Sequence, residues 1–178
     1  TSLKKRIVLA LFTVVCNISK FFTRKSDAMI INSYLPPLKE FGLHLALGQF
    51  PAKWVSPELE IADKPDGLLR KRLSDDFKSH SGGDLEYIIT SLLFELSPVC
   101  FLEGFKNLIK TTNKQPWPKR PKFIFTSNNF DTDEVFKVWT AQKIELGFKY
   151  FTGQHGNIYG THWYTDPTVE EVTADKFL

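Results

Sequence analysis

Two cysteines in a chain of 178 residues are too few for the disulfide framework of a small secreted domain. Cys16 and Cys100 lie far apart among apolar residues, and neither belongs to a Cys-x-x-Cys pair or to a group with the spacing of metal ligands. We therefore expect two buried thiols in a reducing compartment, and no metal ion.

The sequence also lacks a strong excess of either charge. Its formal net charge is +3, and the basic residues are scattered apart from short runs at residues 4–6 and 70–72. This balance argues against a nucleic acid as the partner. A basic face that meets anionic lipid or a phosphate-bearing substrate stays compatible with it, although solvated surface is the simpler interpretation.

No apolar run reaches the length of a membrane span. The longest, residues 7–16, follows three basic residues as in a signal peptide, but no small-residue cleavage site comes after it. A span needs about 20 apolar residues. We predict a helix buried in a core or an interface, with peripheral membrane contact as the alternative.

The composition, with 42% hydrophobic residues and sixteen phenylalanines, is sufficient for a buried core. Short β-prone runs at residues 28–31, 123–126 and 150–152 alternate with helical patterns, which predicts an α/β fold with a Rossmann-like parallel sheet. We expect one domain over residues 1–178, with a helical insertion at about 66–112 and a β-α-β unit at 121–156. The chain stops within a predicted strand, at residues 174–178, so we expect an incomplete N-terminal domain without its second domain.

Helical periodicity and the positions of proline and glycine predict the remaining elements. Within the β-α-β unit, residues 131–146 have helical spacing and end at Gly147. Asp84 is the expected N-cap of the clearest helix, which Pro98 ends. The other expected elements are a helical turn from Pro36 to Gly42, a strand at 43–47 and helices at 68–78 and 99–111.

Polar residues follow three of the predicted strands. They are Asn32 and Ser33, then Ser127, Asn128 and Asn129, then Gln154 and His155. In an open parallel sheet, ligands bind beyond the carboxyl ends of the strands. If these strand ends are neighbours, they form a crevice rich in hydrogen-bonding groups, as a sugar or a phosphate requires.

The chemistry points to His155 more than to a nucleophile. Ser33 and Ser127 lack the G-x-S-x-G elbow, and His155 with His162 makes an incomplete metal-ligand set. An imidazole can act as a general base near neutral pH, and Gly156 allows close approach of a ligand to the backbone. The alternative is that Gln154 and His155 only satisfy the loop's own backbone groups.

An ordered set of segments runs along the chain: residues 31–36 and 47–51, the run from Phe130 to Gly147, the run Gly153-Gln154-His155-Gly156-Asn157-Ile158-Tyr159-Gly160, and residues 174–178. This set resembles a family of bacterial transferases of O-antigen and surface-carbohydrate synthesis. The resemblance implies a GT-B-like enzyme with two Rossmann-like domains, in which a His-Gly loop lies near the acceptor. On this resemblance His155 corresponds to the histidine of that loop, with Gln154 and Gly156 beside it, and Asn157 stands where glycine is more usual.

The sequence therefore predicts a transferase of a sugar or sugar-like unit from a nucleotide-activated donor to a glycan or lipid-linked acceptor. His155 is the catalytic candidate. The expected substrate-binding residues are Gln154, Gly156, Asn157, Asn32, Ser33, Ser127 and Asn128. We expect no permanently bound cofactor, a cytoplasmic location with association at the inner membrane as an option, and an inactive protein without its second domain. A non-catalytic carbohydrate-binding or scaffolding module is the alternative.

Overall fold

The structure is a computed structural model that describes residues 14–15, 18–59, 64–78, 83–156, 159 and 167–178. It divides into two compact units. One, the sheet unit, consists of Thr1–Pro57 and Gln115–Leu178; the other, the helical unit, is Glu58–Lys114. The predicted helix at residues 7–16, Cys16, His162 and Asn157 lie outside or almost outside the described residues. Cys100, in the helical unit, is buried.

The sheet unit is built on four parallel strands that follow one another in chain order across the sheet. They are β1 (Met29–Ile31), β2 (Ile124–Thr126), β3 (Tyr150–Thr152) and β4 (Lys176–Phe177). In the register, Ile30 pairs with Phe125, which in turn pairs with Phe151. This arrangement confirms the predicted α/β fold with a Rossmann-like parallel sheet, and all strands end at the same edge.

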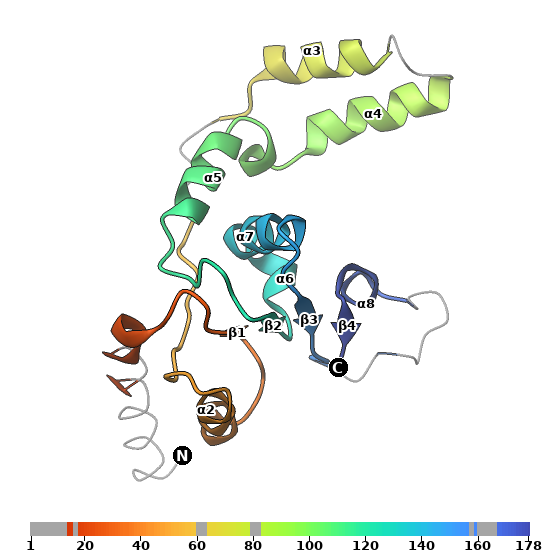
Figure 1. Cartoon of the computed structure of the whole chain (residues 1–178). Helices are drawn as coiled ribbons and strands as arrows, with labels where there is room; N and C mark the ends of the chain where they lie inside the picture. The colour runs from red at the N-terminus through yellow and green to blue at the C-terminus, as the bar shows by residue number, and fades with distance from the viewer. Residues whose placement is uncertain (1–13, 16–17, 60–63, 79–82, 157–158, 160–166) are drawn as a thin grey trace, which may run out of the picture. The chain divides into compact units, whose positions relative to one another are not determined.

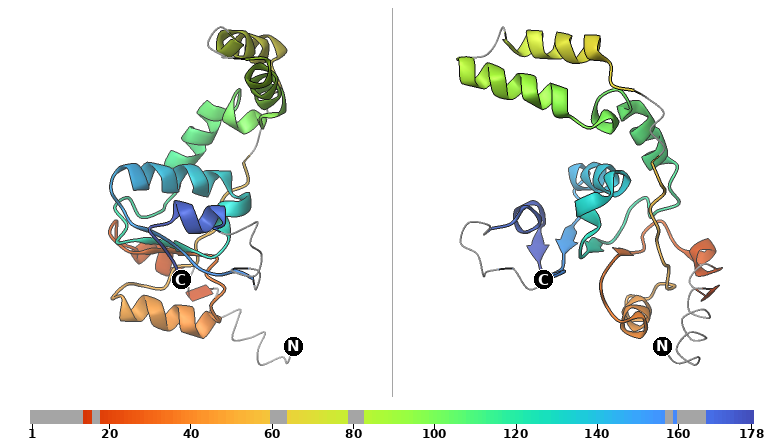
Figure 2. Two further views of the ribbon diagram at one scale, coloured as in Figure 1. Left: turned by 90° about the vertical axis from the view of Figure 1, so that its right-hand side faces the viewer. Right: turned by 180° about the vertical axis from the view of Figure 1, so that it is seen from behind.

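Helices cover both faces of this sheet. Figures 1 and 2 show α7 (Glu134–Glu145) and α8 (Val169–Thr173) on one face and α2 (Pro37–Ala46) on the other. A short 3-10 turn, η1 (Lys20–Phe22), precedes β1. Since parallel strands are covered on both faces, their residues are apolar without alternation, as Met29–Ile31 are.

The helix predicted at residues 131–146 is interrupted near its start. A short α6 (Asn129–Thr132) comes first, and α7 begins after Asp133. The Asp133 carboxylate accepts a hydrogen bond from the Phe136 backbone N–H at 2.9 Å, so it acts as the N-cap of α7 and starts a new helix. Gly147 ends the helix as predicted, with φ of 84°.

The strand predicted at residues 43–47 is wrong, because residues 43–46 belong to α2 and Leu47 is its C-cap. Pro37 occupies the first turn of this helix, where its missing N–H costs nothing. The alternation around His44 is too short to distinguish a strand from one buried face of a helix. His44 is buried, and its Nδ1 lies 2.9 Å from Gln49 Nε2. Burial lowers the pKa of His44, against the opposing effect of the Glu40 and Asp27 carboxylates.

The core above β2 and β3 is aromatic. Trp117 and Trp139 pack edge to face, with ring centroids 5.4 Å apart. Phe136 contacts both of them and also packs against Tyr150 of β3. All four side chains are buried. This packing holds α7 against the sheet and so determines where the strands end.

The helical unit contains α3 (Gly67–Lys78), α4 (Asp84–Leu96), a 3-10 turn η2 (Val99–Phe101) and α5 (Phe105–Asn113). The helix predicted at 68–78 and the end of α4 before Pro98 are confirmed. Two details are wrong: Gly83, and not Asp84, is the N-cap of α4, and the helix predicted at 99–111 is divided. Gly104 caps α5 after the break, consistent with the low helix propensity of glycine.

Candidate functional site

The structure brings the ends of β1 and β2 together. The Ser127 backbone N–H donates to the Asn32 carbonyl at 3.0 Å, and the Ser127 hydroxyl donates to the Ser33 carbonyl at 3.0 Å. Ser33 and Ser127 are both buried, and Asn32 is exposed. The two serines therefore stabilise the loops that follow β1 and β2, and the exposed side chain of Asn32 is available to bind a ligand.

The end of β3 joins the same edge. The Gly153 N–H donates to the Thr126 carbonyl at 2.8 Å. A Cβ at Gly153 would lie 2.8 Å from Phe125 Cζ and 3.0 Å from Ser127 Oγ. A side chain here would force the Phe125 ring and the Ser127 hydroxyl to shift, so glycine permits their close packing against this part of the backbone.

Beyond Gly153 the loop partly satisfies its own polar groups. Gln154 Nε2 donates to the Gly156 carbonyl at 2.6 Å, and the Gln154 N–H donates to the Leu178 carbonyl at 3.0 Å after β4. For Gln154, the side chain therefore has the loop-stabilising role that the sequence left open. Gln154 and Gly156 are both exposed.

His155 lies at this edge in contact with three side chains. Its Nε2 is 3.6 Å from Glu170 Oε1, and its ring packs edge to face on Tyr159 with centroids 5.6 Å apart. Phe130 lies on another side, at 5.9 Å. The imidazole remains 34% exposed, so it is oriented by its neighbours and still open to solvent.

The same carboxylate also binds the phenol. Glu170 Oε1 accepts a hydrogen bond from the Tyr159 hydroxyl at 2.9 Å. Burial alone would raise the pKa of Glu170, but hydrogen bonds from its own backbone, Tyr159 and Thr168, together with His155, lower it below the usual value. Burial and Glu170 raise the pKa of Tyr159 to about 12. Glu170 is thus an anion beside a neutral phenol, and it can stabilise a protonated His155.

The turn after β1 has an unusual backbone. Asn32 and Tyr34 have positive φ angles of 45° and 55°. Asparagine tolerates this region, but it costs a tyrosine free energy. Two contacts hold the turn: Asn128 Nδ2 donates to the Tyr34 hydroxyl at 2.7 Å, and the Leu35 N–H donates to Ser33 Oγ at 3.2 Å. Strained backbone held by its surroundings is frequent at ligand sites.

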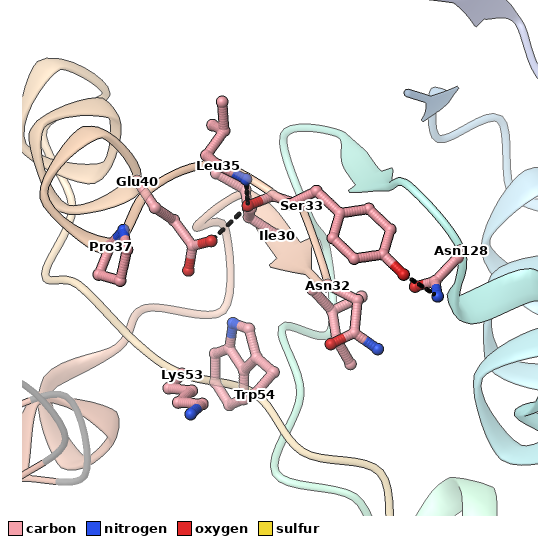
Figure 3. A pocket seen from close by; sticks show the side chains of 11 residues that line it. Ile30, Asn32, Ser33, Leu35, Pro37, Glu40, Lys53, Trp54 and Asn128 are labelled. Carbon is pink, nitrogen blue, oxygen red and sulfur yellow. Dashed lines mark hydrogen bonds between the residues drawn. The ribbon is translucent and has the colours of Figure 1, made fainter. Parts of the chain in front are cut away.

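A pocket of about 330 Å³ lies against this turn (Figure 3). Its polar and aromatic lining comes from Asn32, Tyr34, Glu40, Lys53, Trp54 and Asn128. Three of the predicted binding residues, Asn32, Ser33 and Asn128, line it, and Gln154 and His155 do not. The structure therefore separates the predicted residues into a pocket at β1 and an imidazole at β3.

Two sets of residues were missed from the sequence. Glu40, Lys53 and Trp54 line the pocket but come from α2 and from the segment after it, which carry no motif. In Figure 3 the Ser33 hydroxyl donates to the Glu40 carboxylate. The first turn of a helix is a frequent place for a carboxylate, so Glu40 gave no functional signal.

The other missed set is Ser56 and Asp133, which form a partly buried network below the strand ends with Asn129, one of the polar residues predicted at the end of β2. Asn129 accepts a hydrogen bond from Asn32 Nδ2 and donates to the Asp133 carboxylate at 2.5 Å, and Ser56 also donates to Asp133. Burial raises the pKa of Asp133, and hydrogen bonds from the Phe136 N–H and from Asn129 oppose that effect. Asn129 is only 5% exposed, so it links β1 to the start of α7 without facing solvent. The carboxylate pattern at residues 131–134 indicated a helix start but not this link.

Among the residues that the structure describes, no group of three or more His, Cys, Asp or Glu side chains could hold a metal ion. Nor does any helix in the described segments have the length and apolar character to cross a bilayer.

The parallel sheet, with its polar residues at the carboxyl edge, defines an α/β protein of the Rossmann-like class. More particularly, the chain belongs to a transferase family: the family model described as LIC12162 family transferase matches residues 1–178. No curated protein and no solved structure matches this chain. The transferase part of the sequence-based hypothesis is therefore confirmed.

Proposed function

We propose that this protein transfers a sugar or sugar-like unit from a nucleotide-activated donor to a cell-surface polysaccharide or O-antigen acceptor, which is a glycan or is linked to a lipid. Its membership of a transferase family supports group transfer. The observation that carries the proposal is the pairing of His155 with Glu170 at the carboxyl end of β3, where a ligand of such a sheet binds. A second, GT-B-like domain would supply most contacts to the nucleotide.

His155 acts in this proposal as the general base. Glu170 lies near Nε2 and favours the tautomer that carries its proton there, which leaves Nδ1 with a lone pair. The acceptor hydroxyl loses its proton to Nδ1 as its oxygen bonds to the anomeric carbon of the donor. The bond from that carbon to the phosphate oxygen breaks, and the nucleotide leaves with the electron pair. Glu170 stabilises the imidazolium that forms.

The test compares variants of the full-length protein in transfer assays with a panel of nucleotide sugars and acceptor oligosaccharides. His155→Ala should lower kcat about 100- to 10,000-fold, the range that a general base supplies. Glu170→Gln should lower it less, since it keeps the shape of the side chain. Glu145→Gln, an exposed carboxylate at the end of α7, is the matched control and should leave the rate unchanged.

The outcome that overturns this role is a folded His155→Ala protein with the wild-type transfer rate. A protein that binds oligosaccharides through the same edge but transfers nothing from any donor would instead support a carbohydrate-binding or scaffolding module.

A further inference from the structure

The pocket at the end of β1 contains two buried polar atoms without partners. The indole N–H of Trp54 has no hydrogen-bond acceptor among the described residues, although this side chain is only 6% exposed. Within the same described part, Asn128 Oδ1 is buried without a donor. Both residues line the pocket. A buried polar atom without a partner costs free energy, so these two atoms point to a ligand that supplies one donor and one acceptor.

Glu40 adds a fixed carboxylate to the same pocket. Ser33 donates its hydroxyl proton to this carboxylate, and the Ser33 oxygen in turn accepts the Leu35 N–H at 3.2 Å. Figure 3 shows the Glu40 carboxylate and the indole nitrogen of Trp54 pointing toward each other. The carboxylate is thereby oriented before any ligand arrives. Preorganised polar groups of this kind give specificity at low entropic cost.

The polarity of these groups selects the chemistry of the ligand. A carboxylate and an unpaired amide oxygen accept hydrogen bonds and repel an anion, so they fit hydroxyl groups better than a phosphate. The pocket lining also contains one basic side chain, that of Lys53. The indole N–H fits a hydroxyl or ring oxygen, and the aromatic side chains of Trp54 and Tyr34 offer apolar surface for the C–H groups of a sugar ring.

The size of the pocket agrees with a small ligand. Ligand sites range over about 300–1,000 Å³, and about 330 Å³ is at the lower end of that range. A single ring is therefore a better match than a whole nucleotide sugar.

We propose that this pocket binds a neutral sugar ring or a similar polyol through its hydroxyl groups. The hydroxyl groups donate to Glu40 and to Asn128 Oδ1, and one oxygen accepts the indole N–H of Trp54. The inference rests on the proposed function, which it deepens: the β1 pocket holds a carbohydrate ring of the acceptor or donor, and the nucleotide phosphates lie elsewhere.

The test is a titration of the full chain with methyl glycosides of several hexoses and N-acetylhexosamines, followed by saturation-transfer NMR, with UDP and inorganic phosphate as comparison probes. At least one glycoside should bind. Glu40→Gln should weaken it about 10- to 100-fold, as expected for a hydrogen bond to a charged group, and Trp54→Phe about 2- to 10-fold, as for a neutral one. Thermal unfolding verifies that each variant is folded.

A matched control lies outside the pocket. Glu145→Gln removes an exposed carboxylate. It should keep the affinity of the wild-type protein. The inference is overturned if no glycoside binds, if Glu40→Gln and Trp54→Phe bind as the wild type does, or if UDP or phosphate competes and binds more tightly to Glu40→Gln.

The same variants separate this inference from the proposed function. If glycoside binding depends on Glu40 but transfer survives His155→Ala, the pocket binds a sugar and His155 is not the general base. If transfer depends on His155 but no glycoside binding depends on Glu40, His155 keeps its role and the sugar-binding pocket is rejected.

Discussion

The sheet unit and the helical unit contrast in how they bury apolar side chains. In the sheet unit, Met29, Ile124 and Phe136 are 0% exposed. In the helical unit, α4 buries none of its residues. Its exposed apolar side chains are Leu85, Ile88, Ile89, Leu92, Leu93 and Leu96. Both units have clear helical periodicity, so periodicity alone did not decide which helix faces would be covered.

Different interactions therefore stabilise the two units. The sheet unit depends on apolar packing, which fixes the strand ends and so the position of the candidate site. In the helical unit, α3 and α4 pack through Phe77 and Phe94, with ring centroids 5.4 Å apart. Arg70 pairs there with Glu103 at 2.7 Å. A precise site belongs on the more tightly packed unit, and local opening is expected first in the other.

The largest expected effect is in the core of the sheet unit. Phe136→Ala should lower the free energy of unfolding by about 3–5 kcal/mol, because it leaves a cavity between α7 and the sheet. Urea unfolding measures the loss, and hydrogen exchange followed by peptide mass spectrometry assigns it to the sheet unit. A loss under about 1 kcal/mol would contradict the packing described here.

The next largest expected effect is a loss of stability of the helical unit at low pH. Hydrogen bonds from Arg70 and the Asp66 N–H lower the pKa of Glu103 to about 2. Because this pKa lies below that of the unfolded chain, the pairing stabilises the helical unit above about pH 5, and its contribution is lost as the pH falls toward about 2. Hydrogen exchange in α3 and α4 should rise over this range, after correction for the intrinsic rate.

Arg70→Met is the matched variant for this pH dependence. It should raise exchange in the helical unit at pH 7 by more than it does near pH 2, where Glu103 is becoming protonated in the wild type. Equal effects at both pH values would show that the charge pair is not the stabilising interaction.

A smaller effect is expected below the strand ends. Asn129→Ala removes the link between Asn32 and Asp133 and leaves a partly buried carboxylate with fewer donors. We expect a loss of about 1–3 kcal/mol in the free energy of unfolding. Sugar binding should weaken as well, since Asn32 lines the pocket. Asn107→Ala, in the helical unit, should not change sugar binding, and a parallel loss there would argue against a specific link.

The smallest expected effect is on an exposed apolar residue of the helical unit. Leu93 is 61% exposed, so Leu93→Ala should change the free energy of unfolding by less than about 0.5 kcal/mol. Urea unfolding of the full chain at several protein concentrations measures it. A loss of 2 kcal/mol or more would mean that this face of α4 is covered in solution and that the contrast between the units is smaller than the structure indicates.

Several elements could be predicted because their signals are local. The runs at β1, β2 and β3 are short, apolar and bounded by polar residues, and α3, α4 and most of α7 have helical spacing. Residues 43–47 were misassigned because five residues are too few to separate the two periods. The division of α7 from α6 depends on one capping interaction at Asp133, which spacing does not reveal.

The sequence by itself determined that polar residues follow β1, β2 and β3, since strand boundaries depend on local propensity and pattern. Only the tertiary structure decided which of them meet. Glu40, Trp54 and Asn128 line one pocket although they are far apart in the sequence, and His155 Nε2 lies 3.6 Å from Glu170 Oε1. These contacts depend on the order of the strands and on the packing of helices on both faces, which are set by the whole core and not by any one segment.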